Sequence, residues 1–207
     1  MRESGLDGKM ELIARGLNSA VLSDCHLGVS AGEIVSLRGA SGSGKTLLLR
    51  AIADLDPHEG EVLLGGVARS AMSGPQWRRR VRFVAAEAAW WADRVGEHFR
   101  APDKAAAMAI DVGIPAACMD WAVARLSTGE KQRLGFLRAV EDRPEVLLLD
   151  EPTAALDKTA EQAVEMLIRR LQADGAAIVL VTHSDSQAAR LAARRYVIEG
   201  GRVREAP

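Results

Sequence analysis

The amino-acid sequence predicts an α/β fold in which helices pack on a mostly parallel β-sheet. Apolar runs of strand length alternate with helical patterns along most of the chain, which is typical of such folds. A glycine-rich stretch joins one of these runs to a helical pattern, and another run ends in two acidic residues. With 207 residues the chain can bury one sizeable core, so we expect a single domain over residues 1–207.

The first third of the chain predicts an antiparallel β edge beside the parallel sheet. Segments 11–14 and 21–29 are short, partly alternating in polarity and interrupted by polar residues. Segment 33–37 is typical of a buried strand and leads into the glycine-rich stretch. A helix over 46–55 and a strand over 61–64 are expected to follow.

The middle of the chain predicts a small helical lobe over about residues 90–140, inserted in the core. Strand signals are missing from 90–126, where alanine-rich helical sequence such as 103–110 takes over. A helix over 127–140 completes the lobe.

The last third predicts a return to alternating strands and helices. A strand over 146–149, a helix over 158–172 and a strand over 178–181 come first. A hairpin with two glycines at its turn is expected over 196–205.

The composition of the chain does not identify a binding partner. The formal net charge is −1, so we expect no nucleic-acid partner and no direct attraction to an anionic membrane surface. Cys25 and Cys118 do not form a C-x-x-C motif, and we expect both to be reduced, packed thiols. Residues 1–10 lack the pattern of a secretion signal, and no apolar run approaches the roughly 20 residues that cross a bilayer. We therefore expect a cytoplasmic protein.

The glycine-rich stretch is the strongest motif. It matches the pattern G-x-x-x-x-G-K-S/T and lies between a predicted strand and a predicted helix, the context that distinguishes a phosphate-binding loop from a flexible connection. Backbone N–H groups and the helix N-terminus would bind phosphates, with Lys45 at the β- and γ-phosphates and Thr46 on Mg²⁺. The predicted nucleotide-binding loop consists of Gly39, Ala40, Ser41, Gly42, Ser43, Gly44, Lys45 and Thr46.

Two acids end the apolar run over 146–149. The carboxyl ends of buried parallel strands open into ligand crevices, and alternation along a strand would turn Asp150 and Glu151 in different directions. We therefore expect Asp150 to bind Mg²⁺ and Glu151 to act on the attacking water as a general base. The structural alternative is a solvated acidic strand end.

Three further segments carry a resemblance to a known family. Residues 126–134, LSTGEKQRL, resemble the signature sequence of ABC (ATP-binding cassette) proteins, and 153–157 and 181–183 resemble the D-loop and the switch histidine of that family. The order of the motifs also fits, and the resemblance extends from about residue 21 to residue 204. The sequence is thus identified as similar to the ATP-binding subunit of an ABC transporter, a P-loop NTPase.

The resemblance implies an activity and partners. It implies hydrolysis of ATP with Mg²⁺, in a homodimer whose closure drives transport through a membrane-spanning subunit on a separate chain. The chain would then lie at the cytoplasmic face of the membrane. A soluble ABC-type ATPase that is not coupled to transport is the alternative.

The resemblance also assigns residues. His183 would orient the catalytic water, Asp157 would belong to the D-loop, and Ser127 and Gly129 would complete the ATP site of the second subunit. The sequence S-x-x-E at 127–130 is in addition a helix capping box, and both roles are compatible.

The sequence departs from the family pattern at three places. Thr128 replaces the first signature glycine, and no aromatic residue for adenine stacking occurs near 17–20. Ala86 occupies the position of a glutamine that senses the γ-phosphate, and the neighbouring Glu87 either substitutes for it or is simply solvated.

Two tryptophans follow this third departure. Trp90 and Trp91 fall where the family contacts its membrane partner. In an extended pair one ring would pack in the core and the other would be exposed.

Overall fold

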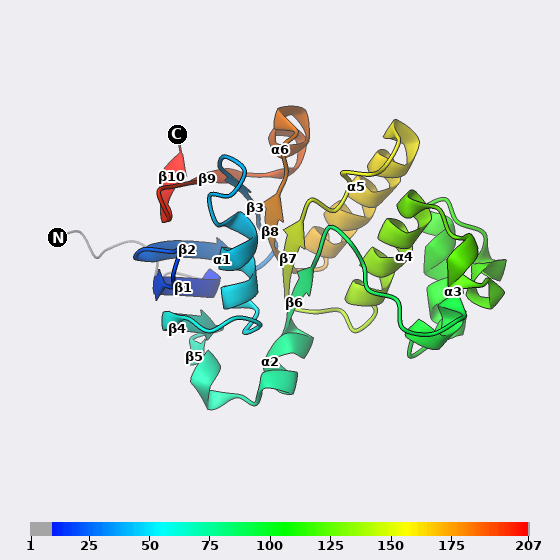
Figure 1. Ribbon diagram of the computed structural model, residues 1–207, viewed down its shortest axis with the longest axis horizontal. Helices are drawn as coiled ribbons and strands as arrows, with labels where there is room; N and C mark the ends of the chain where they lie inside the picture. The colour runs from blue at the N-terminus through cyan, green and yellow to red at the C-terminus, as the bar shows by residue number, and fades with distance from the viewer. Residues whose placement is uncertain (1–9, 207) are drawn as a thin grey trace.

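The computed structural model describes residues 10–206, and its centre is a six-stranded sheet of order β10-β9-β3-β8-β7-β6 (Figure 1). Every neighbouring pair in it is parallel except β9 and β10, which form the expected C-terminal hairpin. The sheet therefore confirms the mostly parallel arrangement. Its strands are β3 (Ile34–Arg38), β6 (Val81–Val84), β7 (Val146–Asp150), β8 (Ala177–Val181), β9 (Arg194–Glu199) and β10 (Arg202–Ala206).

A second, four-stranded sheet is antiparallel throughout and has the order β2-β1-β4-β5. It confirms the antiparallel edge expected from the first third of the chain. The predicted strand over 21–29 begins only at Cys25, because the chain turns before it and Asp24 has a left-handed backbone with φ of 52°. Its strands are β1 (Met10–Asn18), β2 (Cys25–Ser30), β4 (Glu59–Leu64) and β5 (Val67–Ala68).

Helix α1 (Lys45–Ile52) lies between the two sheets, where its apolar face joins both of them in one core (Figure 1). Leu48, Leu49 and Ile52 are fully buried there. Burial of apolar area at about 25 cal/mol per Å² stabilises this sandwich. It also fixes the N-terminus of α1, and with it the glycine-rich loop, at the carboxyl edge of the parallel strands.

Helices α4 (Thr128–Val140) and α5 (Lys158–Ala173) cover the opposite face of the six-stranded sheet and form a second core with it. Helix α3 (Pro102–Asp111) and three short 3₁₀ turns extend this layer away from the sheet, as the green segments of Figure 1 show. They form the helical region predicted from the middle of the chain. The turns are Val95–His98, Ala116–Asp120 and Val123–Arg125.

Two short helices were not expected from the sequence. Helix α2 (Gly74–Arg80) begins with a capping box and a proline and is anchored by the buried Trp77, whose indole N–H donates to the carbonyl of Ile52 over 3.0 Å. Helix α6 (Asp185–Leu191) is capped by Ser184. Each has seven residues, too few for a clear helical periodicity. A third short element, the 3₁₀ turn Arg69–Ala71, precedes α2.

Cys25 and Cys118 are free and buried, as predicted. Among the described residues, no helix combines the length and the apolar character needed to cross a bilayer. The prediction that the N-terminus lacks a secretion signal concerns residues that lie, apart from Met10, outside the described range.

Candidate functional site

The glycine-rich loop connects β3 to α1 as the motif predicted, and its backbone requires glycine. Gly42 and Gly44 have φ values of 77° and 102°, in the left-handed region that other residues rarely adopt. At Gly39 a Cβ atom would lie 2.5 Å from the carbonyl oxygen of Ile198. Side chains at these positions would prevent the loop from curling around a bound anion.

Lys45 is poised at the loop. Its Nζ donates to the carbonyls of Gly39 and Ala40, each over 2.9 Å, and the residue is 9% exposed. The hydroxyl oxygen of Ser43 is buried and has no hydrogen-bond partner within residues 10–206. A buried hydroxyl without a partner is costly, and a phosphate oxygen in the loop would relieve that cost.

Thr46 and Asp150 meet across the site. The Thr46 hydroxyl donates to Asp150 Oδ2 over 2.6 Å, which joins the first turn of α1 to the end of β7. These are two hard oxygen donors of the kind that Mg²⁺ prefers. Residues 10–206 contain no cluster of three or more histidine, cysteine or acidic side chains that could bind a metal ion. The donor set therefore fits Mg²⁺ that takes its other ligands from phosphate and water.

The backbone conformation of Glu151 differs from that of the strand residue Asp150. The residue leaves β7 with a left-handed φ of 53°, and its N–H donates to the carbonyl of Val181 over 3.0 Å. Asp150 is the last residue of β7 and Glu151 lies beyond it, so the alternation expected from the sequence does not determine the direction of Glu151. A left-handed non-glycine residue costs of order 1–3 kcal/mol, and such strain concentrates at functional sites.

Glu151 pairs with His183. Its Oε1 lies 2.8 Å from His183 Nε2, at the point where the chain leaves β8. Burial and the nearby Asp150 raise the pKa of Glu151 above its ordinary value, although His183 and Lys45 oppose the shift. A carboxylate with a raised pKa in a crevice is a suitable general base.

The signature segment begins α4. Ser127 accepts the N–H of Glu130 over 3.2 Å, and the Glu130 carboxylate accepts the Ser127 N–H over 2.8 Å, so the predicted capping box is present. Ser127 and Thr128 are exposed, so the helix N-terminus opens to solvent. Asp157 caps α5 by accepting the N–H of Ala160 over 2.9 Å.

The structure brings together only part of the expected ATP site. Within the described chain, no hydrogen bond or ion pair links Ser127, Gly129 or Asp157 to the loop over 39–46. One residue in contact with the site was missed by the sequence analysis. The buried Gln132 of α4 bonds to the backbone of Glu151; it lies within the signature-like segment 126–134, but that pattern does not indicate which backbone groups it contacts.

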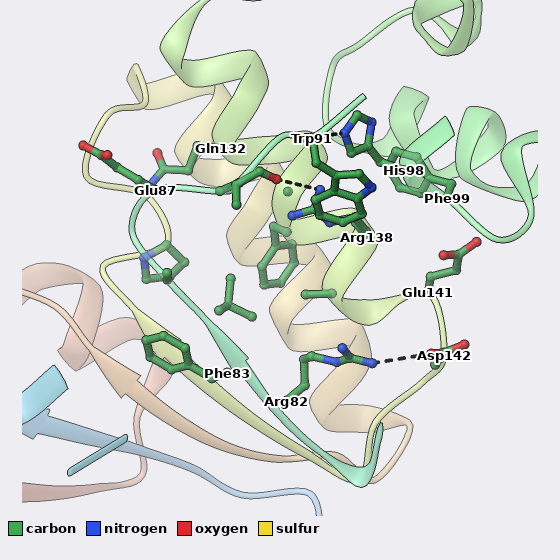
Figure 2. A pocket seen from close by; sticks show the side chains of 18 of the residues that line it. Arg82, Phe83, Glu87, Trp91, His98, Phe99, Gln132, Arg138, Glu141 and Asp142 are labelled. Atoms are coloured by element: carbon green, nitrogen blue, oxygen red, sulfur yellow. Dashed lines mark hydrogen bonds and ion pairs between the residues drawn. The ribbon is translucent and has the colours of Figure 1, made fainter. Parts of the chain in front are cut away.

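A cavity of about 630 Å³ lies beside this site (Figure 2). Strand β6, the segment 85–91, the residues 97–100 and helix α4 line it. Glu87 is exposed at its rim and makes no hydrogen bond or ion pair with residues 10–206, and the neighbouring Ala86 is also exposed.

The two tryptophans differ as predicted. Trp90 packs against the core of the helical layer, whereas Trp91 is 69% exposed and lines the cavity. His98 lies between them, and its Nε2 accepts the N–H groups of Trp91 and Ala92 over 3.0 and 3.1 Å. The guanidinium of Arg138 lies 4.7 Å from the centre of the Trp91 ring (Figure 2). Trp91 is therefore held in place although it is exposed.

The parallel sheet, the glycine loop between β3 and α1, and the acidic end of β7 define the P-loop class of nucleotide-binding folds. Residues 22–154 match the family model of the ABC transporter. The chain belongs to this family, which confirms the resemblance seen in the sequence.

Curated relatives agree with this assignment. The chain is 37% identical over 186 residues to the aliphatic sulfonates import ATP-binding protein SsuB of Burkholderia pseudomallei (strain K96243), covering 89% of the chain and 57% of the relative. For SsuB of Yersinia pestis bv. Antiqua (strain Antiqua), identity is 39%, and the match covers 90% of this chain and 70% of the relative. For the methionine import ATP-binding protein MetN 2 of Salmonella choleraesuis (strain SC-B67), identity is 35%, and the match covers 92% of this chain and 62% of the relative. The chain thus spans little more than half the length of some of these relatives.

A solved structure has the same fold. The structure of an ATP-binding subunit of an ABC transporter superposes with a TM-score of 0.85 at 23% identity, covering 94% of this chain and 89% of the other. At this identity the likeness is one of fold, and it confirms the predicted α/β architecture.

Proposed function

We propose that this protein binds and hydrolyses ATP to ADP and phosphate and thereby drives transport through a separate membrane-spanning subunit. One observation carries the proposal: the carboxyl edge of the sheet brings Lys45, the Thr46–Asp150 contact and the Glu151–His183 pair to one place. The names of the relatives, which are import ATP-binding proteins, support the same function.

Each residue has a role that its geometry supports. Lys45, now bonded to two loop carbonyls, would exchange these acceptors for β- and γ-phosphate oxygens. Thr46 and Asp150 would hold Mg²⁺, which neutralises charge on the phosphates. Glu151 would take the proton of the attacking water, and His183 would orient that water. The chain would thus contribute positioning and electrostatic stabilisation, with little covalent chemistry.

The second half of the site would come from another copy of the chain. Ser127 and Gly129 lie at the exposed N-terminus of α4, a position at which backbone N–H groups favour an anion. A head-to-tail homodimer would place this terminus against the γ-phosphate bound by the partner. Asp157, which caps α5, would lie at the same interface.

The cavity beside the site is our candidate for contact with the membrane subunit. The exposed Trp91 and the neighbouring Arg138 give it an amphipathic surface. Burial lowers the pKa of Arg138, and the nearby Arg82 adds to the shift. Docking there would hold the chain at the cytoplasmic face of the membrane.

The proposal is tested first by nucleotide binding. Lys45→Ala removes the one side-chain cation of the loop and should abolish tight ATP binding in calorimetry. Lys104→Ala, which removes an exposed lysine of α3, is the control and should bind like wild type. Wild-type affinity in Lys45→Ala would contradict the assigned site.

A further inference from the structure

The side chain of Gln132 connects three segments that are distant in sequence. Its Nε2 donates to the carbonyls of Glu151 over 3.0 Å and Ala86 over 3.3 Å, and its Oε1 accepts the N–H of Ala155 over 3.2 Å. Figure 2 shows Gln132 at one end of the cavity, near the segment that carries Glu87. One amide thus joins the proposed base, the D-loop and residues 85–89 beside the cavity, which we call the cavity segment.

The chemistry of the three partners fixes the orientation of this amide. Two carbonyl oxygens require the NH₂ group, and the N–H of Ala155 requires the oxygen. The residue is 7% exposed, so a replacement without these groups would leave polar backbone atoms without partners. Neither an acid nor an apolar residue can make all three bonds.

Gln132 acts on Glu151 through the backbone. The carbonyl of Glu151 accepts from Gln132 and also from the N–H of Ala154. The N–H of Glu151 donates to the carbonyl of Val181. Both sides of the left-handed residue are therefore held, one by β8 and the other by α4. The bond from Gln132 helps to keep Glu151 in a conformation that costs free energy and that aims its carboxylate at His183.

The segment on the other side of Gln132 is packed tightly. A Cβ atom at Gly135, one turn further along α4, would lie only 2.3 Å from the Cβ of Ala88. This close approach brings the carbonyl of Ala86 within reach of Gln132. Ala86 is also the position at which the sequence lacks the glutamine of the family pattern. In this chain a glutamine of α4, Gln132, connects that position to Glu151 instead.

We propose that Gln132 is a positioning residue for ATP hydrolysis, which ties the cavity segment over 85–89 to Glu151 and to the D-loop. It acts by orienting the backbone of the base, because the partners of its side chain are backbone groups. The inference rests on the proposed hydrolysis. A displacement of the cavity segment would reach Glu151 through this amide.

The test compares Gln132→Met, which keeps the length of the side chain and removes all three bonds, with Gln172→Met. Gln172 also donates to a backbone carbonyl, that of Gly32 over 3.1 Å, before β3 and away from the site. We expect Gln132→Met to lower turnover of Mg-ATP by roughly 10 to 100-fold, because misplacement by about 1 Å can cost 10²-fold. ATP affinity in calorimetry should stay within about twofold of wild type, since the phosphate loop is unchanged. Gln172→Met should retain wild-type turnover.

A second readout separates positioning from packing. Amide hydrogen exchange should become faster in both 84–90 and 151–157 in Gln132→Met, and in neither segment in Gln172→Met. If Gln132→Met does not fold, Gln132→Glu, which keeps the acceptor for Ala155, replaces it in both measurements with the same expectation.

The outcomes distinguish this inference from the proposed function. Absence of hydrolysis by wild type would contradict the function, and the exchange experiment would still test the link. Normal turnover and normal exchange in the Gln132 variant would overturn the positioning role. So would a loss of turnover that is accompanied by an equal loss of ATP affinity, because that pattern indicates general damage to the site.

Discussion

At the scale of single residues, the two glutamates of the site have opposite electrostatic environments. Burial raises the pKa of Glu151, whereas the N–H of Ser127 lowers the pKa of Glu130. A raised pKa in the folded state means that the native protein binds the proton more tightly than the unfolded chain does. At neutral pH the charge on Glu151 therefore lowers the stability of the fold, and the charge on Glu130 increases it.

This contrast predicts opposite effects of two matched substitutions. In urea unfolding at pH 7, Glu151→Gln should be more stable than wild type and Glu130→Gln less stable. The stability that protonated Glu151 contributes is fully present below the ordinary pKa of 4.5 and is lost as pH rises through the raised pKa. The excess stability of Glu151→Gln over wild type should therefore disappear as the pH falls toward 4.5. The stability that Glu130→Gln lacks relative to wild type should persist to lower pH, because the pKa of Glu130 is lowered. Shifts of the same sign in both variants would contradict these assignments.

At the scale of elements, strong local patterns were predictable and weak ones were not. Strand β8 and the first four residues of β7 are continuous apolar runs, and the loop over 39–46 has a conformation that only its glycines permit. The short helices α2 and α6 depend on single caps and on tertiary contacts such as the buried Trp77. The bonds of Gln132 join segments up to 46 residues apart, and no local pattern encodes such contacts.

We expect the segment between β1 and β2 to face the base of a bound nucleotide. Val21 is exposed beside the phosphate loop, 3.4 Å from where a Cβ on Gly44 would be, and Ser23 is anchored to the hairpin by its bond to the Gly201 carbonyl. The expected absence of an aromatic ring therefore leaves an aliphatic surface next to the loop.

An aliphatic surface predicts weak discrimination between bases. ATP and GTP should bind with affinities that differ by less than about tenfold, or about 1.4 kcal/mol. Calorimetry on Glu151→Gln measures this without turnover. A preference for ATP of about a hundredfold or more would show that another residue recognises adenine.

At the scale of the whole molecule, the proposed catalytic edge and the cavity lie on the two sides of Gln132. Contact with a membrane partner at the cavity could thus influence the base without any change in the phosphate loop. Trp91 is the most exposed large hydrophobic residue of the cavity and is held by His98 and Arg138. Large, fixed aromatic side chains of this kind are frequent hot spots of binding.

Truncation of this ring should weaken assembly with the membrane subunit. Trp91→Ala should reduce recovery of a multi-spanning membrane protein with the tagged chain by at least about tenfold, since such hot spots contribute 2 kcal/mol or more. Basal hydrolysis and folding should remain close to wild type. Met166→Ala, which truncates a similarly exposed side chain on α5, is the control. Unchanged recovery with Trp91→Ala would exclude the docking role of the ring. Unfolding of that variant would do the same if its remaining folded fraction still assembles like wild type.

We propose that the carboxyl edge of the parallel sheet hydrolyses ATP with Glu151 as general base. The most direct measurement is phosphate release at millimolar Mg-ATP by wild type and by Glu151→Gln, together with ATP affinity and light scattering. The variant should bind ATP like wild type, release phosphate more slowly by roughly 10² to 10⁴-fold and accumulate as an ATP-bound dimer. A variant that releases phosphate at the wild-type rate and stays monomeric would contradict the claim.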